Sequence, residues 1–143
     1  MENPEEVVPA QFPPQSSKPL VVFVDDEPEI LIALERALRG EPYEVYLTTN
    51  PQNALQRVRT HKVSVVVTDH RMPDMDGTTV LRRTREASPR TARVLLTAHP
   101  GDEEVLRARQ EGLLTLFRKP WDVNELKRAL RHRVRERELM AGL

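Results

Sequence analysis

The sequence predicts an α/β fold in which a doubly wound, five-stranded parallel sheet carries helices on both faces. Five short apolar runs of strand type alternate with five segments of helical periodicity between residues 19 and 143. Such strict alternation produces parallel strands, because each helix returns the chain to the same edge of the sheet through a right-handed crossover. Polar residues also follow the strands at their C-terminal ends, where open α/β sheets place their ligand sites.

Apolar runs and turn residues define the first two strand–helix units. Residues 20–24 (Leu-Val-Val-Phe-Val) predict a buried strand. The helix after it starts at Pro28, whose ring suits a first helical turn, and ends at Gly40. Residues 44–48 predict a second, short strand. Asn50-Pro51 then supplies a capping side chain and a proline at the first helical position.

The third predicted strand is a nearly continuous β-branched run. Residues 63–68 read Val-Ser-Val-Val-Val-Thr and lead directly into Asp69. A continuous β-branched run bounded by turn residues indicates a strand that is buried on both faces. The remaining expected elements are a helix at 78–87, a strand at 92–97, a helix at 102–111, a strand at 113–117 and a last helix capped by Asp122 that runs to about Met140.

The chain divides into three predicted segments. Residues 1–18 contain four prolines and few apolar residues, so we expect a flexible, proline-rich arm. Residues 19–135 form the folded domain. Residues 136–143 extend the last helix. The basic residues of that helix, between 127 and 137, are interpreted as a solvated face, with a partner or dimer surface as the alternative.

The composition excludes several classes of function. Lys and Arg total 22 and Asp and Glu total 22, which favours neither nucleic acid nor a membrane surface as a partner. The absence of cysteine excludes disulfides, thiolate metal sites and a cysteine nucleophile. The N-terminus does not resemble a signal peptide, and no apolar run is long enough to span a bilayer. We therefore expect a cytoplasmic protein that binds neither nucleic acid nor membrane directly.

Polar side chains from four strands should meet at one edge of the sheet. They are Asp25, Asp26, Asp69, Thr97 and Lys119. Three neighbouring carboxylates repel one another, and a bound hard cation such as Mg²⁺ relieves that repulsion. One carboxylate could then attack a phosphorus atom and form an aspartyl phosphate. A lysine ammonium and a threonine hydroxyl are suitable partners for the phosphoryl oxygens.

These residues resemble the receiver domain of two-component response regulators (the CheY-like superfamily) over residues 19–135. The resemblance implies a flavodoxin-like sheet in the strand order 2-1-3-4-5. It rests on four stretches: Val24-Asp25-Asp26-Glu27-Pro28, Asp69-His70-Arg71-Met72-Pro73-Asp74-Met75-Asp76-Gly77, Leu96-Thr97-Ala98 and Phe117-Arg118-Lys119-Pro120-Trp121.

The resemblance implies a role for each residue of the site. Asp69 would be the phosphoacceptor, and Thr97 and Lys119 would act with it in catalysis. Mg²⁺ (or Mn²⁺) would be bound by Asp69, directly by Asp26, through water by Asp25, and by the backbone carbonyl of Arg71. The chain would catalyse only its own phosphorylation and dephosphorylation, and would be no enzyme with a separate substrate.

The resemblance also implies residues that switch and tune the domain. Thr97 and Phe117 would be the switch pair, with Phe117 swinging inward as Thr97 moves. Arg71 and His99 would tune the loss of the phosphoryl group, and the Lys119–Pro120 peptide bond would be cis. His70 is a departure, because an apolar or aromatic residue is more usual directly after the phosphoacceptor.

The function implied is a phosphorylation-dependent signalling switch. A histidine kinase or phosphotransfer protein would supply the phosphoryl group. Output would pass to a downstream protein, or to a second copy, through the face formed by the helix at 102–111, the strand at 113–117 and the last helix.

Two alternatives remain open. In the first, the chain is the N-terminal receiver fragment of a larger regulator, because the turn at 119–122 and the loop at 71–77 look like those of receivers joined to HD-GYP-type output domains. In the second, the chain is a Mg²⁺-dependent small-molecule phosphohydrolase. The sequence disfavours this reading, because Arg71 stands where haloacid-dehalogenase enzymes have a second aspartate.

Overall fold

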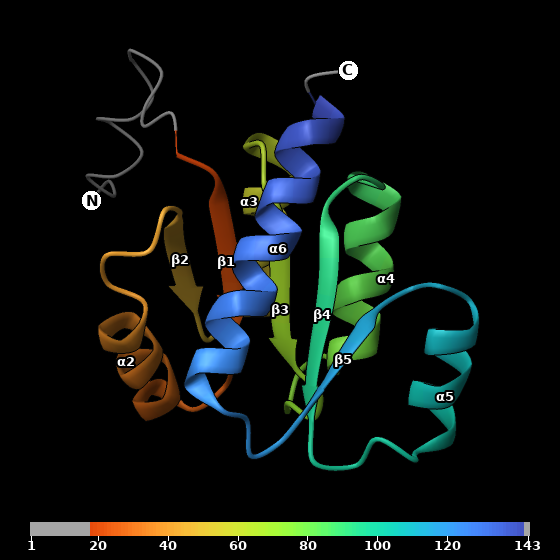
Figure 1. Ribbon diagram of the computed structural model, residues 1–143. Helices are drawn as coiled ribbons and strands as arrows, with labels where there is room; N and C mark the ends of the chain where they lie inside the picture. Colours follow the sequence, from red (N-terminus) through yellow and green to blue (C-terminus); the bar gives the residue numbers. More distant parts are fainter. Residues whose placement is uncertain (1–17, 142–143) are drawn as a thin grey trace, which may run out of the picture.

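The computed structural model describes residues 18–141, and Figure 1 labels its elements from β1 to α6. The strands are β1 (Leu20–Val24), β2 (Glu44–Thr48), β3 (Val65–Asp69), β4 (Ala92–Thr97) and β5 (Thr115–Arg118). The helices are α2 (Pro28–Ala37), α3 (Pro51–Thr60), α4 (Gly77–Ala87), α5 (Glu103–Gln110) and α6 (Val123–Ala141). The predicted arm at 1–18 lies outside the described residues except for Lys18, and so does the end of the predicted extension, 142–143.

All five strands pair in parallel, in the order β2-β1-β3-β4-β5. This confirms the predicted fold class and strand order. Two strands have bounds that differ from the prediction: β3 covers 65–69 instead of 63–68, and β5 covers 115–118 instead of 113–117. β3 includes Asp69, because Asp69 pairs with Leu96 of β4. β5 starts two residues late, because the Leu113 N–H donates to the Ala108 carbonyl (2.9 Å) and completes the turn that ends α5.

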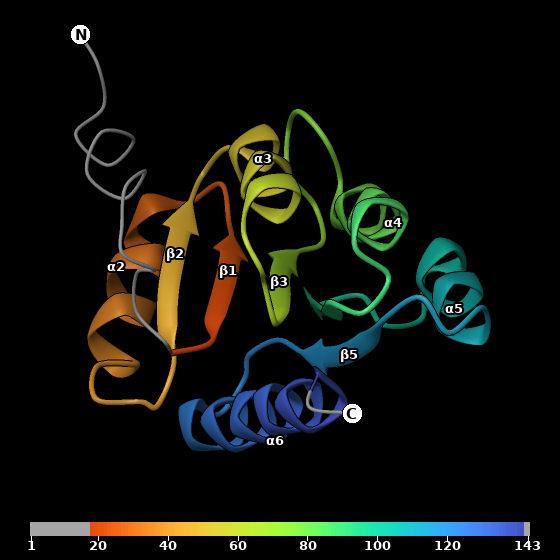
Figure 2. The ribbon, with the colours of Figure 1, turned by 90° about the horizontal axis from the view of Figure 1, so that it is seen from above.

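Two apolar layers cover the two faces of the sheet. Helices α2 and α6 lie on one face, and α3, α4 and α5 lie on the other (Figure 2). Alternate residues of each strand enter the two layers: in β3, Val65 and Val67 face α2 and α6, whereas Val66 faces the other three helices. All three side chains are fully buried. The continuous apolar runs of the sequence therefore follow from burial on both faces.

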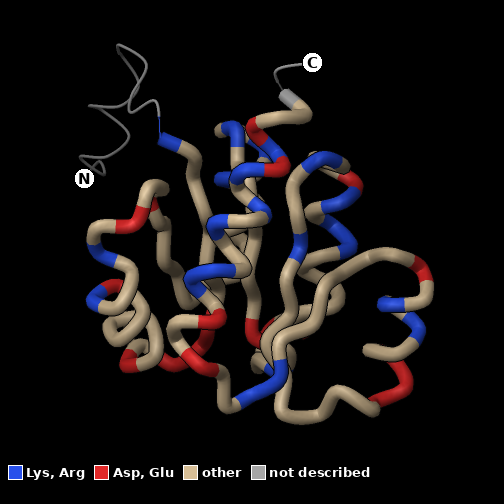
Figure 3. The backbone as a smooth tube through the Cα atoms, in the orientation of Figure 1, with Lys and Arg blue, Asp and Glu red and all other residues tan. Residues whose placement is uncertain are grey.

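Charged residues are distributed unevenly along the helices. Acidic residues occur in the first turns of α2, α5 and α6, and basic residues in the last turns of α2, α3, α4 and α5. This placement complements the helix dipoles. Each helix returns the chain from the carboxyl edge of the sheet to the opposite edge. Acidic groups consequently gather around the carboxyl edge, the lower end of the molecule in Figure 3.

The loop between β3 and α4 closes tightly on itself at Gly77. The Gly77 N–H donates to the His70 carbonyl (2.7 Å), and Asp76 caps α4 by accepting from the Thr79 N–H (3.2 Å). A Cβ atom on Gly77 would lie 2.2 Å from the Asp69 carbonyl oxygen and 2.7 Å from Cδ1 of Leu95. The start of α4 therefore packs directly against the backbone of Asp69, which a side chain at position 77 would prevent.

We predict that Gly77→Ala lowers the free energy of unfolding by about 2–4 kcal/mol, because the new methyl group meets backbone that cannot rotate away. Urea denaturation measures this loss. Gly101→Ala is the matched control: a Cβ there meets nothing within 4 Å, so the change should be within about 0.5 kcal/mol of zero. Equal stability of the two variants would contradict the close packing of Gly77.

Candidate functional site

The residues expected at the carboxyl edge of the sheet meet there. Asp25 directly follows β1, Asp69 ends β3, Thr97 ends β4, and Lys119 follows β5. One carboxylate oxygen from each of Asp25, Asp26 and Asp69 lies within 4.8 Å of the others. The crossover argument from the sequence therefore identified the correct cluster.

The ammonium group of Lys119 contacts this acidic cluster. The Nζ atom of Lys119 lies 2.5 Å from Oδ1 of Asp69. Asp69 is 8% exposed and Asp25 is 3% exposed, so these two carboxylates are largely shielded from bulk water, whereas Asp26 is more exposed. Three carboxylates beside one ammonium leave an excess of negative charge, and two of the three are poorly solvated.

Asp25 is the most deeply buried residue of this cluster, and its carboxylate has few stabilising contacts with the described residues. Burial raises the pKa of Asp25 from 3.8 to about 6; the Glu27 N–H, which donates to Oδ1 (2.9 Å), acts against that rise, and the neighbouring Asp69 adds to it. The second oxygen, Oδ2, is buried and accepts no hydrogen bond from the described residues. A buried carboxylate oxygen without a partner is unfavourable unless another ligand supplies one.

The donor set fits a hard divalent cation. Oxygen atoms of several carboxylates are the ligands that Mg²⁺ and Mn²⁺ prefer, and Oδ2 of Asp25 is available to such an ion. Asp25, Asp26 and Asp69 would hold it. The backbone carbonyl of Arg71 remains a predicted additional ligand.

The Thr97 hydroxyl is turned toward the α5 side of the site. Its Oγ1 accepts a hydrogen bond from the His99 N–H (2.8 Å) and lies 2.7 Å from Nδ1 of His70. Thr97 is fully buried. Its hydroxyl is therefore held by the loops after β3 and β4 and does not point freely into the acidic cluster.

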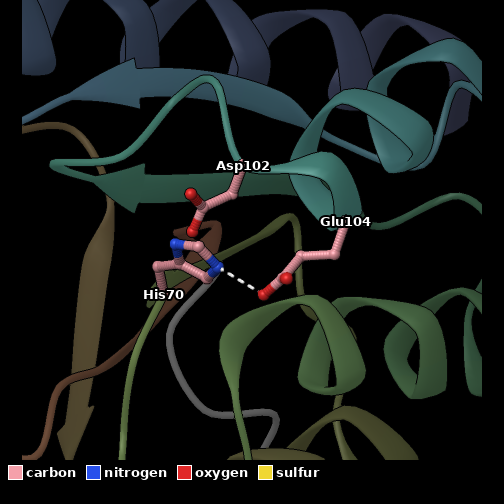
Figure 4. A group of neighbouring side chains, drawn as sticks. All are labelled: His70, Asp102 and Glu104. Atoms are coloured by element: carbon pink, nitrogen blue, oxygen red, sulfur yellow. Dashed lines mark hydrogen bonds and ion pairs between the residues drawn. The ribbon is translucent and has the colours of Figure 1, made fainter.

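His70 is a buried residue beside the site whose contacts sequence reasoning did not predict. Its ring is 2% exposed, and its Nε2 lies 3.1 Å from Oε2 of Glu104 in α5. Figure 4 shows the imidazole between Glu104 and Asp102, with one oxygen or nitrogen of each residue within 4.8 Å of the others. The only signal in the sequence was that an imidazole is unusual directly after Asp69.

The two predicted tuning residues contribute differently. The exposed guanidinium of Arg71 forms an ion pair with Asp102, the residue that precedes α5, and the Asp102 side chain makes no capping bond to the helix. This ion pair holds the Arg71 side chain beside the start of α5. The His99 side chain is exposed, and its backbone N–H holds Thr97. Their effect on phosphoryl loss remains a prediction.

The turn after β5 has the expected cis Lys119–Pro120 peptide bond. The packing of Phe117 is less favourable to its predicted role. Phe117 pairs with Leu96 and packs, half-buried, in the layer beneath α2 and α6, whereas Leu116 packs in the opposite layer. Thr97 follows Leu96 and so faces the side of Leu116. An inward swing of Phe117 coupled to Thr97 therefore does not follow from this packing.

The fold and the site define a class: flavodoxin-like domains with an acidic cluster beside a lysine at the carboxyl edge of the sheet. Comparison with known families narrows this class. The family model described as the response regulator receiver domain matches residues 21–131, which is most of the chain. The chain belongs to the receiver domain family of two-component systems, as the sequence motifs predicted.

Relatives come from several bacterial regulators. The DNA-binding transcriptional regulator NtrC of Escherichia coli is 31% identical over 117 residues, which cover 79% of this chain and 25% of that protein. Sporulation initiation phosphotransferase F of Bacillus subtilis is 28% identical over 111 residues, covering 78% of this chain and 90% of that protein. The chain thus spans about a quarter of the length of the NtrC relatives it matches.

One solved structure is especially similar. The signal receiver domain of an HD domain-containing protein from Pseudomonas fluorescens matches with a TM-score of 0.80 and 30% sequence identity, over 92% of this chain and 97% of that one. The similarity to a receiver from an HD-domain protein agrees with the motifs of the loop at 71–77 and the turn at 119–122.

We predict that Asp25→Asn stabilises the protein in metal-free buffer at pH 7 by about 1–3 kcal/mol, because the folded wild type must hold a carboxylate whose pKa is raised. Asp25 is ionised in the unfolded chain above about pH 4 but in the folded chain only above about pH 6, so wild-type stability falls as the pH rises between these values. Denaturation curves with chelator from pH 4 to pH 8 measure the difference.

The gain from Asp25→Asn should fall to a small fraction of its pH 7 value near pH 4, where the folded wild-type carboxyl is protonated and the unfolded one is close to its own pKa. Asp74→Asn, at an exposed acid of the loop after β3, is the control and should show no such pH dependence. A gain that does not change with pH would contradict the assignment to Asp25 ionisation.

Proposed function

We propose that this receiver is a phosphorylation-dependent switch in which Asp69 accepts a phosphoryl group from a histidine kinase or phosphotransfer protein. The observation that supports this most directly is the Lys119–Asp69 contact of 2.5 Å beside the carboxylates of Asp25 and Asp26. This contact brings together the side chains that phosphoryl transfer to Asp69 would require: an acceptor carboxyl group, an ammonium group for the phosphoryl oxygens, and further carboxyl groups for a cation.

The chemistry follows from these groups. An oxygen of Asp69 forms a bond to phosphorus while the phosphorus–nitrogen bond of a phosphohistidine breaks, and the bonding pair leaves with the imidazole nitrogen. Lys119 then pairs with a phosphoryl oxygen, and the Thr97 hydroxyl donates to another. A bound Mg²⁺ would supply positive charge that offsets the phosphoryl oxygens. The chain catalyses only its own phosphorylation and dephosphorylation.

Output requires a surface that changes when Asp69 is phosphorylated. The face formed by α5, β5 and α6 lies beside Thr97 and Lys119, the residues that contact the phosphoryl group in this proposal. We propose that this face binds a downstream protein or a second copy of the chain. Light scattering on a sizing column distinguishes the two: a dimer that forms only on activation identifies the second copy, and a monomer assigns the face to another protein.

A second candidate function is that of a receiver domain within a larger regulator. The similarity to the receiver of an HD domain-containing protein, together with the short coverage of the NtrC relatives, favours a receiver that works within a larger regulator with an HD-GYP-type or other output domain. In that case α6 leads toward the output domain. A small-molecule phosphohydrolase has less support, because position 71 carries an arginine that pairs with Asp102.

We predict that the protein incubated with Mg²⁺ and beryllofluoride or acetyl phosphate forms one adduct, on Asp69. The adduct should be lost in Asp69→Asn, which removes the nucleophile, and in the presence of chelator, which removes the counter-charge for the acidic cluster. Native mass spectrometry and amide NMR spectra measure the adduct and its stoichiometry.

Asp74→Asn is the control, because Asp74 is an exposed acid five residues further along the same loop, and it should label as the wild type does. An unmodified wild type, or an adduct that survives Asp69→Asn, would contradict the assignment of the phosphoacceptor.

A further inference from the structure

We infer that His70 is a positioning residue of the switch: it holds the hydrogen of the Thr97 hydroxyl away from the phosphoryl site and links that hydroxyl to α5 through Glu104. The inference rests on the proposed function, because it concerns what Thr97 must release when Asp69 is phosphorylated. Three residues carry it, from the loop after β3, the end of β4 and the first turn of α5.

The hydrogen-bond inventory decides which atom donates. A carboxylate only accepts, so the hydrogen between Glu104 and His70 belongs to Nε2 of the imidazole. In the neutral imidazole only one ring nitrogen carries a hydrogen, so with that hydrogen on Nε2 the ring accepts at Nδ1, and the hydrogen of the 2.7 Å contact belongs to the Thr97 hydroxyl. The His99 N–H already donates to the same hydroxyl oxygen. The hydrogen of Thr97 is therefore committed to His70.

The committed hydrogen creates a competition. A threonine hydroxyl has one hydrogen, and a phosphoryl oxygen on Asp69 would need that hydrogen. The Thr97 hydroxyl can bond to His70 or to the phosphoryl group, but it cannot donate fully to both. His70 thus stabilises the unphosphorylated arrangement and sets how strongly a phosphoryl group must attract Thr97 to activate the domain.

Because His70 is buried, loss of its hydrogen bond to Thr97 is unfavourable for the imidazole. The imidazole is 2% exposed, so an Nδ1 atom that loses the Thr97 hydroxyl has little access to water. An unpaired buried acceptor is unfavourable, and the ring or its neighbours must therefore rearrange to satisfy it. The opposite nitrogen is bonded to Glu104, so that rearrangement reaches the first turn of α5.

A second contact connects the same two segments. Arg71, next to His70, forms an ion pair with Asp102, two residues before Glu104. Two successive residues after Asp69 thus hold the start of α5, one by a buried hydrogen bond and one by a surface ion pair. Phe117 packs in the layer beneath α2 and α6, whereas a chain of side-chain hydrogen bonds on the α5 side of the sheet leads from Thr97 through His70 to Glu104.

The test uses Mg²⁺ and beryllofluoride with four variants and two measurements. The first is the beryllofluoride concentration at half-saturation; the second is the activation-induced change in the α5 amide NMR shifts, residues 103–110. His70→Leu removes both hydrogen bonds, so we expect affinity to rise about two- to tenfold, the factor for one neutral hydrogen bond, and the α5 response to be lost.

Three further variants test the Thr97–His70 bond and the His70–Glu104 bond separately. His70→Asn offers a side-chain oxygen to Thr97 but is too short to reach Glu104, so affinity should stay near that of the wild type while the α5 response is lost. Glu104→Gln keeps an acceptor for Nε2 and should retain the response, whereas Glu104→Ala should abolish it. Glu103→Ala, at the neighbouring exposed acid of the same turn, is the control and should change neither measurement.

The outcomes separate this inference from the proposed function. A wild type that takes up no beryllofluoride would overturn the proposed function itself. A wild type that does so, with His70→Leu and Glu104→Ala matching it in both affinity and α5 shifts, would overturn the role of His70 alone. Because Glu104 lies at the surface, Glu104→Ala keeps the test valid even if the buried substitutions impair folding.

Discussion

Excess negative charge at the carboxyl edge of the sheet is the constraint on which the rest of the structure depends. Parallel strands bring Asp25, Asp26 and Asp69 together, and Lys119 contacts one of these carboxylates. The buried, unpartnered oxygen of Asp25 makes this arrangement costly for the folded state. Two fully buried apolar layers offset that cost. A stable core that holds an unfavourable polar cluster is typical of a functional site.

Most of the fold and the central site could be predicted from the sequence, for one physical reason. Uninterrupted β-branched runs identify buried parallel strands, and right-handed crossovers then require their C-terminal ends to meet. Asp25, Asp69, Thr97 and Lys119 each lie at such an end, so their proximity follows without coordinates. The exact ends of the strands do not follow from this argument, because hydrogen bonds from neighbouring turns decide whether residues such as Leu113 join the sheet.

Two features could not be predicted because they depend on loop geometry and register. The partner of His70, Glu104, lies 34 residues away, and their contact requires the loop after β3 to close at Gly77 and α5 to start beside it. The strand predicted at 113–117 reads Leu-Leu-Thr-Leu-Phe, so its sequence does not alternate and gives no sign of which side chain faces which helices. Only the pairing with Leu96 settles that question.

The separation of acidic and basic helix ends makes the molecule an electric dipole. The chain as a whole carries equal numbers of basic and acidic residues, so its field at long range comes from their arrangement and not from a net charge. A small anionic phosphodonor that approaches the acidic end meets repulsion. A protein that carries its phosphoryl group within a basic surface meets attraction and a torque that aligns the two sites. Because salt screens this field over about 8–10 Å, the preference for a protein donor should weaken as ionic strength increases.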